Sequence, residues 1–169
     1  MTIETWEKLT SVILSVITSL SFIIAGIWAY RRFIIQQERY PNLNFTADIN
    51  VIGKQNNEWL VEVLAFVENT GKAQHKIREF WFNLDLIYKM DPLTLSPKWG
   101  EQVEFTEFIE RSFLPEHIRF FFVDPGTTAK YSYIAKIPDN ASFALLHCHF
   151  KYSDSRRYGH SAEKTIKLP

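Results

Sequence analysis

The pattern of hydrophobic and polar positions changes once along the chain, near residue 42. Leu9 to Tyr30 is a run of twenty-two residues without a charged side chain. An α-helix of that length spans about 33 Å, against roughly 30 Å of bilayer hydrocarbon. The run therefore predicts one N-terminal transmembrane helix. A buried core helix is the less favoured alternative.

The flanks of this run favour a retained span over a cleaved signal peptide. The eight residues before it hold two acids and one lysine, whereas a signal peptide begins with basic residues. Trp28-Ala-Tyr-Arg-Arg32 closes the run with interfacial aromatics and two arginines. The positive-inside rule then places the N-terminus outside the plasma membrane and residues 31–169 in the cytoplasm, as a single-pass protein. We expect the helix to continue as a juxtamembrane neck as far as Pro41, which cannot extend it.

One face of the predicted span carries mostly small or hydroxylated side chains. They recur at spacings of three and four, at Ser11, Ser15, Thr18, Phe22, Ala25 and Ala29. Three interpretations stay open: the hydroxyl groups bond back to their own helix, the stripe joins copies in a homo-oligomer, or several spans line a pore. The span has no charged side chain of the kind that marks an ion pathway.

From Asn42 onward, short alternating runs separated by turn signals replace the helical pattern. One run ends at Asn69-Thr-Gly71, where we expect a turn with a positive φ at the glycine. In another run, Phe80, Phe82, Leu84, Leu86 and Tyr88 share one strand face, opposite Trp81, Asn83, Asp85, Ile87 and Lys89. The pattern predicts seven or eight strands, near 43–52, 58–68, 77–89, 103–109, 118–123, 128–137, 142–152 and 158–168. Their short connections predict an all-β domain, an antiparallel two-sheet sandwich, with a surface loop at residues 91–102.

Composition adds limits to this organisation. Residues 1–40 form the tail, span and neck, and residues 41–169 are long enough for one sandwich domain. The 19 basic and 19 acidic side chains cancel, which argues against a sequence-independent nucleic-acid binder. Cys148 is the only cysteine, so the chain can form no internal disulfide.

Two resemblances follow from these motifs. The run from Trp59 to Gly71 resembles the second strand of bacterial immunoglobulin-like modules of the cell-adhesion-related (CARDB) type. The order Pro125-Gly126, strand, Asp139-Asn140, strand, turn and strand is similar to their closing half. One span followed by a sandwich also resembles small bacterial membrane proteins. The resemblance implies an immunoglobulin-like sandwich, and it transfers no functional residue.

His147-Cys148-His149 is the main candidate for chemistry. The two histidines share a strand face, away from Cys148, which we interpret as a small buried hydrophobic residue. If Asp154-Ser155 is a two-residue turn, His160 faces His149, and three imidazoles could meet a zinc ion. Alternatively, the histidines fill a half-exposed sheet face, and a slip of one residue turns His160 over. We assign no metal-ligating, catalytic or cofactor-binding residue.

Two further segments have competing interpretations. Arg156-Arg157 could bind a phosphate or an acidic partner, although a solvated loop tip is favoured. Ile118–Val123 is apolar on both faces, as in a central, doubly covered strand or an oligomer interface. Phe105, Phe108, Ile109 and Phe113 extend the same cluster.

Three classes of function follow. The favoured one is a membrane-anchored interaction or scaffold module that holds a protein partner near the lipid bilayer. The second is a small oligomeric membrane effector, whose sandwich senses a ligand and whose span perturbs the bilayer. The third, a metal-dependent enzyme built on the histidines, is least favoured. We therefore expect no enzymatic activity and no cofactor.

Overall fold

The computed structural model describes residues 3–32, 41–97, 100–153 and 158–169. These ranges hold one α-helix and ten β-strands. The chain divides into two units, Met1–Pro41 and Asn42–Pro169, and each is described by itself.

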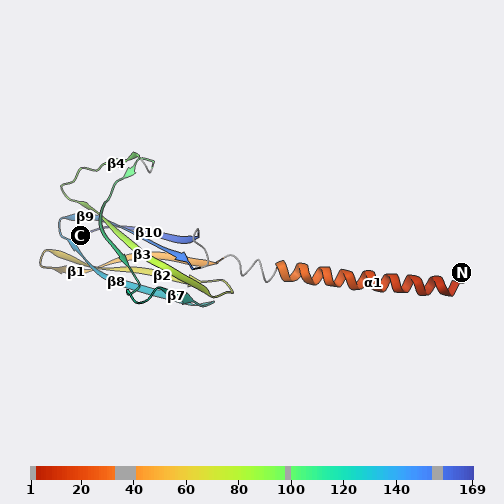
Figure 1. Cartoon of the computed structure of the whole chain (residues 1–169). Helices are drawn as coiled ribbons and strands as arrows, with labels where there is room; N and C mark the ends of the chain where they lie inside the picture. The colour runs from red at the N-terminus through yellow and green to blue at the C-terminus, as the bar shows by residue number, and fades with distance from the viewer. Residues whose placement is uncertain (1–2, 33–40, 98–99, 154–157) are drawn as a thin grey trace. The chain divides into compact units, whose positions relative to one another are not determined.

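Helix α1 (Ile3–Tyr30) is an unbroken rod in Figure 1. Its window Lys8–Tyr30 has 23 residues and a mean hydropathy of 2.2, and none of it is buried. Within the described ranges it is the one helix long and apolar enough to cross a membrane, which confirms that part of the prediction. A signal sequence near an N-terminus has the same length and apolar character. The predicted neck falls largely on residues 33–40, outside the described residues.

The second unit contains two main antiparallel sheets (Figure 1). Sheet A has the order β1-β2-β8, formed by β1 (Leu43–Gln55), β2 (Glu58–Asn69) and β8 (Thr128–Pro138). Sheet B has the order β10-β9-β3-β6, formed by β3 (His75–Tyr88), β6 (Thr106–Ser112), β9 (Ala141–Tyr152) and β10 (Gly159–Lys167). Strand β7 (Phe120–Val123) also pairs with β3. The antiparallel, sandwich-like arrangement is thus confirmed.

The predicted count of seven or eight strands is wrong, because the described residues contain ten. The additional strands are β4 (Leu95–Ser96) and β5 (Gln102–Val103), which pair with each other. Strands of two residues produce no detectable alternation, so the sequence pattern predicts only a surface loop at residues 91–102. The β4 segment stands away from the main sheets in Figure 1.

Alternation along the strands builds the core between the sheets. The fully buried side chains include Val61, Val63, Ala65 and Val67 of β2, Phe80, Phe82, Leu84 and Leu86 of β3, and Leu146 and Cys148 of β9. Phe80 lies at the centre of an aromatic cluster. Its ring centroid is 4.8–6.0 Å from those of Phe45, Phe113, Phe121, Tyr131 and Phe150. Because Phe45 and Tyr131 belong to sheet A, this cluster joins the two layers.

A β-bulge interrupts β3. Glu79 and Phe80 together lie opposite Phe150, because the β3–β9 register shifts between Arg78 and Trp81. Glu79 adopts a left-handed backbone conformation with a φ of 53°. The extra residue lets Ile77 and Phe80 both point into the core, although they are an odd number of residues apart.

Asn69 ties the end of β2 to its neighbours. Its buried side chain donates hydrogen bonds to the carbonyl oxygens of Ala73 (2.8 Å) and Val123 (2.9 Å). Its Oδ1 accepts one from the Gly71 N–H at 2.9 Å. The expected positive φ at Gly71 is wrong, since among described glycines only Gly100 and Gly126 have one. Glycine suits this position because a Cβ would lie 3.1 Å from Asn69 Oδ1.

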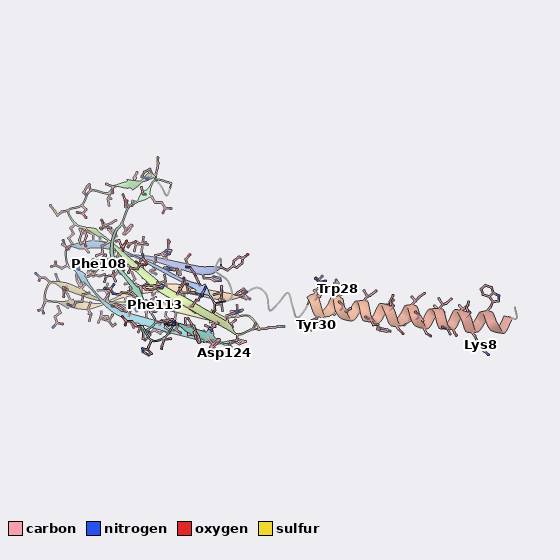
Figure 2. All side chains as sticks on the ribbon, in the orientation of Figure 1. Lys8, Trp28, Tyr30, Phe108, Phe113 and Asp124 are labelled. Atoms are coloured by element: carbon pink, nitrogen blue, oxygen red, sulfur yellow. The ribbon has the colours of Figure 1, made fainter. Side chains whose placement is uncertain are left out.

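The expectation of a doubly covered strand at Ile118–Val123 is also wrong. Val123 is buried and Phe121 packs against the core, but Phe120 and Phe122 are 42% and 50% exposed. Within the described ranges β7 pairs only with β3, so it lies at an edge of sheet B. Phe108 and Phe113 (Figure 2) pack against the core from the preceding segment.

Truncating Phe80 should destabilise the sandwich far more than truncating an exposed phenylalanine. We expect Phe80→Ala to lower the free energy of unfolding by about 3–5 kcal/mol, because the cluster would retain a cavity. The matched variant Phe122→Ala should change it by less than about 0.5 kcal/mol. Urea unfolding of the full-length protein in detergent, followed by tryptophan fluorescence, measures both values. Equal losses would contradict the placement of the core.

Candidate functional site: the outer face of sheet B

The three predicted histidines do not converge. His147 and His149 share the outer face of sheet B, as predicted, with ring centroids 5.8 Å apart. The β9–β10 register pairs His160 with Phe150, and His149 with Ser161. His160 therefore faces inward and stacks on the Phe150 ring at 5.5 Å. The expected strand register was wrong by one residue, which inverts the strand face on which His160 lies.

The other candidates from the sequence are a metal site, Cys148 and the Arg156-Arg157 pair. No group of three or more His, Cys, Asp or Glu side chains in the described part of the chain is arranged to hold a metal ion. Cys148 is fully buried, as predicted, and burial raises the pKa of its thiol to about 12. Arg156 and Arg157 lie outside the described residues.

The hydroxyl groups of α1 bond back to their own helix. Thr10, Ser11, Ser15, Thr18, Ser19 and Ser21 each donate to a backbone carbonyl three or four residues earlier, at 2.8–2.9 Å. This agrees with the interpretation that the hydroxyl groups of the stripe bond back to their own helix. Association of spans stays a prediction.

Polar side chains that face outward gather at one end of sheet B. Across the sheet, Asn83 lies between Glu110 of β6 and His147 of β9. Asp85 lies in the next row, opposite Glu107. We call Asn83, Asp85, Glu107, Glu110 and Glu163 the acceptor half of the outer face. His147 joins it because its Nδ1 lies within hydrogen-bond distance of Glu163 Oε1, at 2.8 Å.

Two acceptors in this half lack donors. Asn83 Oδ1 and Asp85 Oδ1 are buried and have no hydrogen-bond partner among the described residues. Burial, and secondly the charge of Glu107, raises the pKa of the Asp85 carboxyl above its usual value. The site therefore combines exposed carboxylates with two buried oxygen atoms that lack donors among the described residues.

His149 lies beside the acceptor half, in surroundings that lower its pKa. Burial lowers the pKa of His149, and the nearby charges of His147 and Lys151 lower it further. On the neighbouring strand β3, His149 pairs with Trp81, whose side chain is partly exposed.

The opposite end of the same face has different chemistry. Lys76 and Arg78 of β3 point outward beside Phe120 and Phe122 of β7, and Lys151 of β9 lies opposite Arg78. We call these five residues the aromatic–basic half. Lys76 Nζ lies 3.8 Å from the Phe120 ring centroid, and the two phenylalanine rings are 5.5 Å apart. From Lys76 to Asp85 the strand covers about 30 Å at its usual rise per residue.

Sequence reasoning found only part of this face. Alternation identified Trp81, Asn83 and Asp85 as one strand face. The glutamates come from β6 and β10, and only the strand register places them beside β3. The split between acidic and basic ends depends on the bulge at Glu79, which leaves no clear mark in the sequence.

Removing the Asp85 charge should stabilise the fold at neutral pH. Because the folded-state pKa is raised, the ionised carboxylate disfavours the native state once the pH exceeds that pKa. We expect Asp85→Asn to increase the free energy of unfolding at pH 7. The gain should shrink as the pH falls through the folded-state pKa, and vanish below the usual value of 3.8, where both states are protonated.

Urea unfolding at a series of pH values measures this gain. Asp91→Asn, at an exposed position, is the control and should change stability little. A destabilised Asp85→Asn protein at pH 7, or a gain that persists at low pH, would contradict the burial of an unpaired carboxylate.

Comparison with known proteins yields no family. The sequence matches no protein-family model and no curated protein. Among solved structures, the chain is similar to a Bordetella pertussis protein designated ApaA (12% identity, 76% of this chain, 95% of that one, TM-score 0.49). It is also similar to the sporulation control protein Spo0M of Bacillus subtilis (11% identity, TM-score 0.45). That match covers 73% of this chain and 48% of Spo0M. A third is a FixG-related protein of Vibrio parahaemolyticus (12% identity, 75% of this chain, 94% of that one, TM-score 0.35). With TM-scores below 0.5, these likenesses support no statement about function.

Proposed function

We propose that this protein is a single-pass membrane protein whose β-sandwich is a binding module for a protein partner. The observation that carries the proposal is α1, whose 23-residue apolar window is entirely unburied. Each large apolar side chain gains roughly 1.5–3 kcal/mol on leaving water, so such a helix strongly favours an apolar environment. A bilayer provides one along its whole length.

The ends of α1 support a retained span with the sandwich in the cytoplasm. Trp28 and Tyr30 lie at one end of the helix, and Lys8 lies near the other (Figure 2). The Arg32 guanidinium lies 5.1 Å from the Trp28 ring centroid, a pairing suited to a membrane interface. The positive charges after the helix favour the cytoplasmic side for the domain.

The strand order supports an immunoglobulin-like type of sandwich. The first two long strands, β1 and β2, share a sheet with β8, while β3, β9 and β10 form the other sheet. Immunoglobulin domains place their first, second and fifth strands opposite their third, sixth and seventh in the same way. Because a fold implies no function, the role has to be argued from the surface.

The acceptor half supports a partner with basic side chains. Buried Asn83 Oδ1 and Asp85 Oδ1 lack donors, and Glu107 and Glu110 stand exposed beside them. A lysine or arginine from another protein would supply the charge opposite to that of Glu107 and Glu110. The module would hold such a segment at the membrane surface.

Membrane residence is tested by fractionation of cells that express the full-length protein. We expect the protein to stay in membranes after alkaline carbonate extraction, with residues 1–30 still present by mass spectrometry. Protease should reach the sandwich only from the cytoplasmic side. Ile17→Asp should release much of the protein, because a mid-span acid opposes insertion by about 3 kcal/mol, whereas Ile17→Leu should not. Full-length wild type in the aqueous fraction, or a chain cleaved behind α1, would contradict the proposal.

Partner chemistry is tested with a lysine-rich decapeptide and the full-length protein in detergent. We expect binding that weakens with salt, and a roughly tenfold or greater loss in Glu107→Gln/Glu110→Gln, because each lost contact to a charged group is worth about 1.5–3 kcal/mol. The control Glu62→Gln/Glu68→Gln removes the same charge from sheet A and should bind as wild type does. Equal losses in both variants would show only non-specific attraction.

A further inference from the structure

We infer that the aromatic–basic half of sheet B docks onto anionic lipid headgroups of the membrane that α1 spans. The inference rests on the proposed span, and it assigns a second role to the outer face of sheet B. The acceptor half then remains the surface for a protein partner.

The side chains of this half combine the two features that a lipid surface selects. Phe120 and Phe122 expose aromatic rings on an edge strand, and Ile118 before them is 40% exposed. Lys76 packs its Nζ over both rings, at 3.8 Å and 5.9 Å from their centroids. Apolar rings with a cation beside them fit the boundary between acyl chains and phosphate headgroups.

The charge of this half is locally positive, although the whole chain is neutral. Lys76, Arg78 and Lys151 carry three positive charges. The negative charge of Glu79 offsets one of them through a 2.6 Å ion pair with Lys151. Arg78 Nε has no hydrogen-bond partner among the described residues, and its ion pair with Glu79 is long, at 3.8 Å. Headgroup phosphates would pair with the positive charges of this half.

The position of this half within the sandwich favours lipid over an acidic protein. Val123, next to Phe122, accepts a hydrogen bond from Asn69, and Asn69 pairs with Leu43 at the start of the domain. The two phenylalanines thus lie at the end where the chain enters the sandwich. Only nine residues lie between Arg32 and Asn42, so the sandwich begins a short stretch of sequence after the proposed span.

The test uses the full-length protein in lipid nanodiscs with an environment-sensitive NBD fluorophore on Ile118→Cys. Cys148 is fully buried, so the label attaches to the introduced thiol alone. One set of discs contains phosphatidylcholine only, and the other contains roughly a third phosphatidylserine. We expect brighter, blue-shifted emission in the anionic discs, which reverses in high salt.

Matched variants separate this half from general charge. Each positive charge near an anionic surface is worth about fivefold, so Lys76→Gln/Arg78→Gln should lower the docked-to-undocked ratio roughly 25-fold. Lys130→Gln/Lys167→Gln removes the same charge elsewhere on the sandwich and should dock as wild type does. Phe120→Ser/Phe122→Ser should also dock less, and circular dichroism checks that each variant folds.

Several results would overturn the inference. Incorporation into discs without any response to phosphatidylserine would remove lipid docking and leave the span intact. A response to an oligoglutamate peptide but not to lipid would assign this half to an acidic protein. Equal losses of docking in Lys76→Gln/Arg78→Gln and in Lys130→Gln/Lys167→Gln would also overturn the inference. Failure to enter even phosphatidylcholine discs would overturn the span, and the docking with it.

Discussion

The bulge at Glu79 decides what each side of sheet B presents. Strand β3 contacts β9 on one edge and both β6 and β7 on the other, so its alternation sets the faces of the whole sheet. Without an extra residue, Ile77 and Phe80 could not both reach the core. Because both do, Lys76 and Arg78 before the bulge and Asn83 and Asp85 after it all lie on the outer face. An ion pair of 2.6 Å joins Glu79 of the bulge to Lys151 of β9.

The outer face is polarised in a way that the net charge of zero conceals. One end exposes phenylalanine rings and cations, and the other concentrates carboxylates and unpaired acceptors. Buried acceptors without donors destabilise an isolated domain, and stable folds rarely retain them without a use. Two of these buried acceptors, Asn83 Oδ1 and Asp85 Oδ1, lie in the acceptor half. The two ends lie far enough apart to engage different surfaces at once.

Much of the fold was predictable, because alternation over long strands is a strong signal. The apolar helix, the long strands, the shared face of Phe80, Phe82, Leu84 and Leu86 and the burial of Cys148 were all predicted and confirmed. Register was not predictable: one residue separated the expected partner of His149 from the real one, and the histidine site depended on it. The edge position of β7 was not predictable either, because its run of phenylalanines is typical of a buried strand, although Phe120 and Phe122 are exposed. The candidate site needs neighbours from four strands, which no local pattern supplies.

Amide hydrogen exchange of the full-length protein in phosphatidylcholine nanodiscs tests most directly whether α1 lies in lipid. No contact within the described chain buries this helix, so any strong protection of its amides must come from the bilayer. We predict that Leu9–Tyr30 exchanges as slowly as the inner strands β2, β3 and β9. Exchange of α1 at the rate of a solvated helix, while those strands stay protected, would contradict the membrane span.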